Sequence, residues 1–315
     1  MIPDEGTIGV VGAGVIGTGV CQAFAESGFH VVAVDVDPAQ LQRSRNNIQR
    51  GIRLRSLLRS ASTDREVGPI LDRIRFTSDP GALASSGWLI ENVTERWDTK
   101  ARLYPELDRI CPPTTRFAVN TSAIPITRVA GLTQRPERVV GMHFMNPVPL
   151  MSMVEVVRGR LTSDETIEAA KRLLSTLGRE CIVVSDSPGF VTNRVMMLTV
   201  NEAAFLLQEG VARSAEDVDR LFKTCFGHRM GPLETADLIG LDTVLLSLEV
   251  LRDETGDPKF RPCPLLRNLV YAGMLGRKSG EGFHSYEGAG ASSPPQRRES
   301  DGPSARQGLH PRLSG

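Results

Sequence analysis

The stretch from Thr7 to Asp35 limits the possible folds more than any other part of the chain. Residues 7–11 (TIGVV) predict a short buried strand, because they are β-branched and apolar and have no helical period. The strand leads directly into the turn GAGVIG at residues 12–17, which apolar residues at helical spacing follow. A second apolar run at residues 31–34 ends in Asp35, about twenty residues after the glycines. This order of strand, glycine turn, helix, strand and acid predicts a dinucleotide-binding βαβ unit.

The glycine turn supplies what a pyrophosphate needs. Gly12 permits the tight turn, Gly14 lets the backbone approach the phosphates, and Gly17 lets helix and strand pack closely. With Val15 and Ile16 these glycines form the predicted cofactor-binding turn. The helix that starts there offers free N–H groups and a partial positive charge to the phosphates.

Asp35 predicts which dinucleotide binds. Its carboxylate can accept hydrogen bonds from the adenosine ribose hydroxyls, and its charge repels a 2′-phosphate. NAD is therefore the expected cofactor, in preference to NADP.

Composition and charge exclude several classes of function. The 315 residues suffice for two domains, and 37 basic residues balance 37 acidic ones, so we expect neither nucleic-acid nor anionic-membrane binding. No segment approaches the ~20 apolar residues of a membrane span, and the N-terminus lacks the pattern of a signal peptide. Five cysteines without a CxxC pair fit neither a disulfide framework nor a zinc site. We expect a cytoplasmic protein with reduced thiols and no metal.

Residues 1–186 have the alternating pattern of a doubly wound α/β sheet. Apolar strands at 7–11, 88–93 and 117–121 end in glycine or polar residues, and parallel strands end at the same edge of a sheet. A ligand site is therefore expected at that edge.

Two helical segments after Asp35 predict a helical hairpin inserted between strands. The simplest interpretation of its many arginines is a solvated face; they are Arg43, Arg45, Arg50, Arg53, Arg55 and Arg59.

The pattern becomes helical after the break at residues 185–189. We predict a Rossmann-type NAD-binding domain over residues 1–186 and an all-α C-terminal domain over residues 187–287. The apolar surface of the second domain favours a homodimer. The tail at 288–315 is rich in Gly, Ser, Pro and Arg, and we expect it to be disordered.

His143 and Glu155 are the candidate catalytic pair. His143 lies near the end of one predicted strand, and Glu155 lies near the start of its antiparallel return. A lone histidine on a strand is more often structural, but a carboxylate on Nδ1 would fix its tautomer and favour proton transfer. Beside a nicotinamide, this pair predicts interconversion of an alcohol and a carbonyl.

The sequence resembles the L-3-hydroxyacyl-CoA dehydrogenase family, which includes 3-hydroxybutyryl-CoA dehydrogenases, from about Thr7 to Tyr286. The resemblance rests on a series of ordered motifs along the chain. They are GAGVIG at 12–17, ENVTE at 91–95 with Lys100, NTS at 120–122, GMHFMNP at 141–147, Glu155, SPGFVTNR at 187–194, MGP at 230–232 and GLD at 240–242.

The resemblance implies a role for each matching position. His143 would be the general base on the 3-hydroxyl, oriented by Glu155, and Ser122 and Asn193 would hydrogen-bond the substrate oxygen. Asn146 would support the site around His143. The resemblance also implies cofactor contacts by a further group: Glu95, Lys100, Asn120 and Ser122. Without the motifs, Ser122 would be interpreted as a strand-end cap and Asn193 as a surface amide.

The sequence departs from the family where the thioester carrier would bind. Acyl-CoA members commonly have lysines near the hairpin turn and a Met-Lys-Leu segment after the Asn-Pro-Val-Pro turn. Here these stretches read RSAS at 59–62 and MSM at 151–153, so Arg55 and Arg59 are the remaining cationic candidates for substrate contacts. The substrate is thus a 3-hydroxyacyl thioester of either CoA or an acyl carrier protein, such as the glyceryl units that relatives oxidise in polyketide extender pathways.

Two other functions remain open at this point. The fold and the catalytic pair would also suit a dehydrogenase of a free hydroxy acid or sugar acid. No arginine near His143 provides a carboxylate clamp, which counts against that function. A non-catalytic cofactor-binding protein is the other alternative, and the joint presence of Ser122, His143, Glu155 and Asn193 argues against it.

Overall fold

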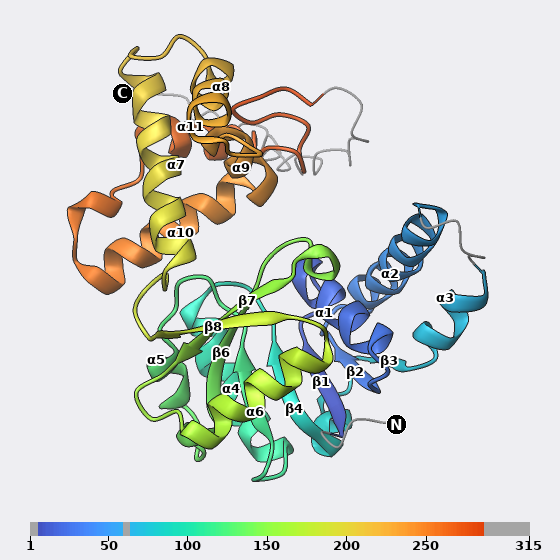
Figure 1. Ribbon diagram of the computed structural model, residues 1–315. Coiled ribbons are helices and arrows are strands. Elements are labelled where there is room, and N and C mark those ends of the chain that lie inside the picture. Colours follow the sequence, from blue (N-terminus) through green and yellow to red (C-terminus); the bar gives the residue numbers. More distant parts are fainter. Residues whose placement is uncertain (1–5, 59–63, 287–315) are drawn as a thin grey trace, which may run out of the picture.

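The computed structural model describes residues 6–58 and 64–286, which form a sheet domain followed by a helical domain (Figure 1). The strands lie side by side in the order β3 (Ile74–Thr77), β2 (Val31–Val34), β1 (Thr7–Val11), β4 (Ser86–Glu91), β5 (Arg116–Val119), β6 (Val139–Phe144), β7 (Met153–Arg158) and β8 (Glu180–Ser185). All neighbouring pairs are parallel except β6 and β7, so β7 and β8 run against the other strands.

Helices cover both faces of this sheet. They are α1 (Val15–Glu26), α2 (Pro38–Leu58), α3 (Asp64–Leu71), α4 (Trp97–Ile110), α5 (Ile126–Ala130) and α6 (Asp164–Thr176), with short 3₁₀ turns η1 (Pro80–Ser85), η2 (Pro136–Arg138) and η3 (Val148–Leu150). Alternate strand residues enter different cores: Val10 packs with the core that contains α1 and α6, and Val11 packs with the core that contains α4. The predicted doubly wound α/β fold is confirmed.

The predicted helical hairpin is also confirmed, because α2 and α3 connect β2 to β3. Leu41, Ile48 and Ile52 form the buried side of α2, and their spacings of seven and four residues keep them on one face. The buried hydroxyl of Thr18 on α1 donates to Ser44 on α2 at 2.9 Å. This side of the hairpin therefore anchors α2 against the cofactor-turn helix α1.

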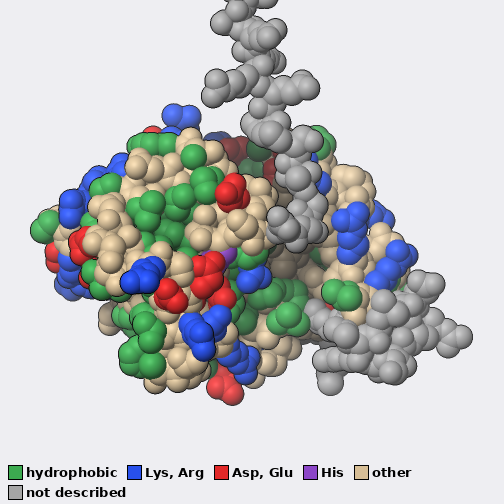
Figure 2. Space-filling model, turned by 90° about the horizontal axis from the view of Figure 1, so that it is seen from above, with side chains coloured by type: hydrophobic (Ala, Val, Ile, Leu, Met, Phe, Trp, Pro, Cys, Tyr) green, Lys and Arg blue, Asp and Glu red, His purple; other side chains and the backbone are tan. Residues whose placement is uncertain are grey.

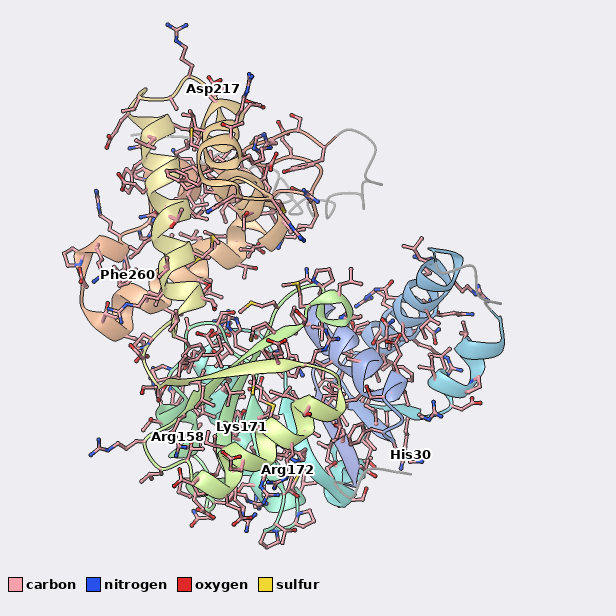
Figure 3. The ribbon with its side chains drawn as sticks, in the orientation of Figure 1. His30, Arg158, Lys171, Arg172, Asp217 and Phe260 are labelled. Atoms are coloured by element: carbon pink, nitrogen blue, oxygen red, sulfur yellow. The ribbon has the colours of Figure 1, made fainter. Side chains whose placement is uncertain are left out.

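The C-terminal domain consists of helices. They are α7 (Thr192–Gln208), α8 (Ala215–Phe226), α9 (Pro232–Ile239), α10 (Leu241–Thr255) and α11 (Pro264–Tyr271), with a 3₁₀ turn η4 (Pro258–Phe260). Phe260 is completely buried and packs with apolar residues of α7 and α10 (Figure 3). Gly240 adopts φ +101° and ends α9, so the chain between Gly231 and η4 forms the two helices α9 and α10.

The two domains are joined by the segment between β8 and α7, and the predicted boundary at residues 186–187 falls in it. The amide of Gly189 donates to the carbonyl of Ala123, so this segment passes the turn that follows β5. The predicted tail at 288–315 lies outside the described residues. Within the described ranges, no helix has the length and the apolar character to span a membrane.

Candidate active site

The turn between β1 and α1 has the shape of a phosphate cradle. Gly12 has φ +87°, and a Cβ there would lie 2.8 Å from the carbonyl oxygen of Asn92. A Cβ on Gly17 would lie 1.9 Å from the carbonyl oxygen of Gly12, so helix and strand meet only because residue 17 is glycine. A Cβ on Gly14 would meet no described atom within 4 Å, and no described side chain caps α1. The open space and the free N–H groups of α1, including those of Val15 and Ile16, fit the pyrophosphate of NAD.

Asp35 lies directly over this turn. Its Oδ2 accepts from the amide of Ala13 at 2.7 Å, and its Oδ1 accepts from the amide of Asp37 at 3.0 Å. Each oxygen keeps a lone pair for a further donor, which fits the ribose hydroxyls of the cofactor. The carboxylate is held at the end of β2, beside the predicted phosphate position.

Asn120 ties together the ends of three strands. Its Nδ2 donates to Asn92 after β4 at 2.7 Å, and its Oδ1 accepts from the amide of Phe144 on β6 at 3.1 Å. The amide of Asn92 also donates to the carbonyl of Val11 at the end of β1, so the predicted convergence of the strands at 7–11, 88–93 and 117–121 is present at the carboxyl edge of the sheet.

Glu95 organises the turn that carries Ser122. Its Oε1 accepts from the hydroxyl of Thr121 and from the amides of Ala123 and Ile124 at 3.1 and 3.2 Å. A cofactor contact by Glu95 would use the other carboxylate oxygen. Glu95 therefore holds the turn that presents Ser122 by three hydrogen bonds.

Lys100 differs from the expectation that it lines the cofactor. Its ammonium is completely buried and lies 2.8 and 2.6 Å from the two oxygens of Glu91, which is also completely buried. Tyr104 donates its hydroxyl to Glu91 at 3.0 Å. Burial and the negative charge of Glu91 raise the pKa of Tyr104 well above its usual value, so it remains a donor. A buried ammonium needs such a charged partner. The Lys100–Glu91 pair therefore supports the loop after β4 from inside the fold and does not face the cofactor site.

The register of two strands assembles the candidate catalytic pair. His143 on β6 lies directly opposite Glu155 on β7, and His143 Nδ1 is 3.1 Å from Glu155 Oε2. The other ring nitrogen, Nε2, lies 3.0 Å from the hydroxyl oxygen of Ser122. Both members of the pair are buried. The three side chains form one hydrogen-bonded line, which is suited to moving a proton at Nε2.

Glu155 is held by two further donors that the sequence did not single out. The amide of Val191 donates to Oε1 at 2.8 Å, and the hydroxyl of Thr192 donates to Oε2 at 2.7 Å. Burial on its own would raise the pKa of Glu155, but the hydrogen bonds from His143, Thr192 and Val191, with the charge on His143, lower the pKa to about 2. Glu155 is consequently ionised throughout the neutral range.

Asn193 and Asn146 lie in different surroundings. The Nδ2 of Asn193 is buried and, among the described residues, has no hydrogen-bond partner, which fits a donor kept for a ligand oxygen. Asn146 is exposed and lies in the turn after β6. Hydrogen bonds thus join Ser122, His143 and Glu155 to one another.

Asn146 instead lines a groove of about 340 Å³ between α1, α2 and the turn after β6. Val15 lines it from α1, Leu54 from α2, and residues 147–150 from the turn. Arg59 and the side chain of Arg55 lie outside what the structure describes. The groove begins beside the phosphate cradle, since Val15 belongs to both.

A phosphate cradle, an acid for the ribose and a histidine–glutamate pair at one sheet edge define an NAD-dependent oxidoreductase. Two family models match the chain, namely "3-hydroxyacyl-CoA dehydrogenase, NAD binding domain" over residues 7–187 and "3-hydroxyacyl-CoA dehydrogenase, C-terminal domain" over residues 189–286. The chain belongs to the 3-hydroxyacyl-CoA dehydrogenase family.

Curated relatives and solved structures agree with this assignment. A probable 3-hydroxybutyryl-CoA dehydrogenase of Bacillus subtilis is 44% identical over 88% of this chain and 96% of its own length. The crystal structure of (S)-3-hydroxybutyryl-CoA dehydrogenase from Ralstonia eutropha has a TM-score of 0.81 and 42% identity, covering 89% of this chain and 98% of that one. FadB2 of Mycobacterium tuberculosis has a TM-score of 0.84 and 37% identity at the same coverage.

Proposed function

We propose that the protein oxidises the 3-hydroxyl of a short 3-hydroxyacyl thioester to the 3-oxo compound, or catalyses the reverse reaction. The observation that carries this proposal is the line of hydrogen bonds from Ser122 through His143 to Glu155. The unpartnered amide of Asn193 supplies a further donor for the substrate oxygen.

His143 acts as the general base in the oxidation. Because Glu155 accepts from Nδ1, we assign the ring proton to Nδ1 and the free lone pair to Nε2. A substrate hydroxyl that binds beside Ser122 loses its proton to Nε2, while bound NAD supplies the hydride acceptor. Ser122 and Asn193 donate to the substrate oxygen and stabilise the negative charge that develops on it. Glu155 stabilises the imidazolium that results.

Coenzyme A is the first candidate for the thioester carrier. The relatives are named as 3-hydroxybutyryl-CoA dehydrogenases, and the groove beside the cradle offers an apolar channel for an extended thioester arm. We propose that the arm enters between Leu54 and the turn at residues 146–150.

An acyl carrier protein is the second candidate. It is favoured by the missing lysines around the hairpin turn and at residues 151–153, since a carrier-bound arm lacks the 3′-phospho-adenosine end of CoA. The exposed Arg50 and Arg53 are next to the groove residues Gly51 and Leu54, so they would attract a carrier protein that presents an acidic face.

The experiment is a substrate panel followed by NADH absorbance. We expect turnover of 3-hydroxybutyryl-CoA, and faster turnover of a carrier-bound hydroxyacyl group would select the second carrier. In that case the double variant Arg50→Ala/Arg53→Ala should raise the KM for the carrier protein. The control is Arg43→Ala, which should leave this KM unchanged, because the guanidinium of Arg43 pairs with Asp37. Tight NADH binding without turnover of any thioester would contradict the proposal and favour a free hydroxy acid substrate or a non-catalytic role.

We also propose that the protein forms a homodimer through its helical domain. Val211, Leu221 and Phe226 are more than half exposed around α8, and Figure 2 shows hydrophobic side chains gathered over this domain. Large exposed apolar patches usually mark association surfaces. Light scattering of the wild type should give twice the mass of one chain. Phe226→Glu should lower the measured mass towards that of one chain. A wild type with the mass of one chain would refute the proposed homodimer.

A further inference from the structure

The carboxylate of Glu155 is shared between the two domains. Oε1 accepts from the backbone amides of Val191 and Thr192 at 2.8 and 3.3 Å. Oε2 accepts from His143 Nδ1 at 3.1 Å and from the Thr192 hydroxyl at 2.7 Å. Thr192 Oγ1 also lies 3.4 Å from His143 Nδ1, so the three side chains form a closed triangle.

The turn before α7 is strained in a way that favours this arrangement. Phe190 has φ +50°, which is a costly conformation for a bulky residue. Its ring is buried and packs edge-to-face against His143, with ring centroids 6.0 Å apart. The N-cap residue Val191 makes no side-chain cap among the described residues, and Glu155 from β7 takes that place at the start of α7. The strained turn thus presents Thr192 to the catalytic pair.

We propose that Thr192 is a positioning residue for the proposed reaction, and the inference rests on that reaction. Its hydroxyl holds Glu155 Oε2 at the distance and orientation in which His143 keeps its proton on Nδ1 and turns Nε2 towards Ser122. As the first residue of α7, Thr192 couples the pair to the docking of the helical domain.

The test compares Thr192→Val, which keeps the shape and removes the hydroxyl, with Thr192→Ser, which keeps the hydroxyl. We expect Thr192→Val to lower kcat about tenfold, as the loss of a hydrogen bond to a charged group would. The KM for NAD should stay within about twofold, because Thr192 does not touch the cradle. The acid limb of the kcat/KM profile should move to lower pH, since a displaced carboxylate stabilises the imidazolium less. Thr192→Ser should restore kcat and the profile.

A second readout is independent of turnover. In ¹⁵N-histidine NMR spectra, with the His143 signals identified by their loss in His143→Gln, the wild type should show the Nδ1–H tautomer. Thr192→Val should show a mixture of tautomers, while its circular dichroism spectrum shows that it is folded. Unaltered kcat, pH profile and tautomer in Thr192→Val would overturn the inference. A wild type that turns over no thioester would instead contradict the proposed function, and the NMR comparison would still decide the role of Thr192.

Discussion

Replacing Lys100 with Met tests whether this lysine is part of the fold or part of the cofactor site. The ammonium and Glu91 are both completely buried, and Val93 and Tyr104 donate to the same carboxylate. Removing one partner leaves an uncompensated buried charge, which costs about 3–5 kcal/mol. For a chain of this size each kcal/mol corresponds to about 2–4 °C, so we expect the melting temperature to fall by about 6–20 °C.

The double variant Glu91→Gln with Lys100→Met separates the two roles. Because it removes both charges, it should lose less stability than either single variant, and the amide oxygen can still accept from Val93 and Tyr104. Denaturant unfolding measures the stability, and fluorescence titration measures NADH affinity. We expect the double variant to bind NADH within about threefold of the wild type, because the side chain of Lys100 has no solvent-exposed surface that a cofactor could touch. A folded double variant that has lost NADH binding would refute the structural role of Lys100.

Three further outcomes follow from the site. His143→Gln should lower turnover about 10²–10⁴-fold while NADH titration shows intact cofactor binding; lost binding would mean that the residue is misplaced. Asp35→Ala should weaken NADH more than NADPH in the same titration, since it removes a ribose acceptor and a charge that repels a 2′-phosphate; an unchanged preference would disprove the ribose contact. Glu155 has a folded-state pKa of about 2, below its ordinary 4.5, so its contribution to stability is complete above the ordinary value and is lost as the pH falls towards 2. The difference in unfolding free energy between the wild type and Glu155→Gln should therefore grow from pH 2 to about pH 5 and then level off; a difference that does not change with pH would contradict this.

Local sequence patterns were sufficient for much of the fold. The βαβ unit, the inserted hairpin and the change to helices after residue 186 each depend on periodicity and on turn residues within a short window. The opposition of His143 and Glu155 was also predictable, because two strands joined by a short turn pair antiparallel. The division between α9 and α10 does not follow from local sequence, since the positive φ of Gly240 depends on its surroundings.

Side-chain environment was decided only by the tertiary structure. A charged residue in a helix, such as Lys100, is exposed by default, and only the packing of α4 against the sheet encloses it with Glu91. Thr192 has no catalytic signature in sequence, yet the turn at Phe190 brings its hydroxyl to Glu155, 37 residues earlier in the chain. The sequence alone therefore determined which chemistry this protein carries, because phosphate cradles and strand pairs are local. The fold decided which groups hold that chemistry in place, because burial and long-range hydrogen bonds exist only once the chain has folded.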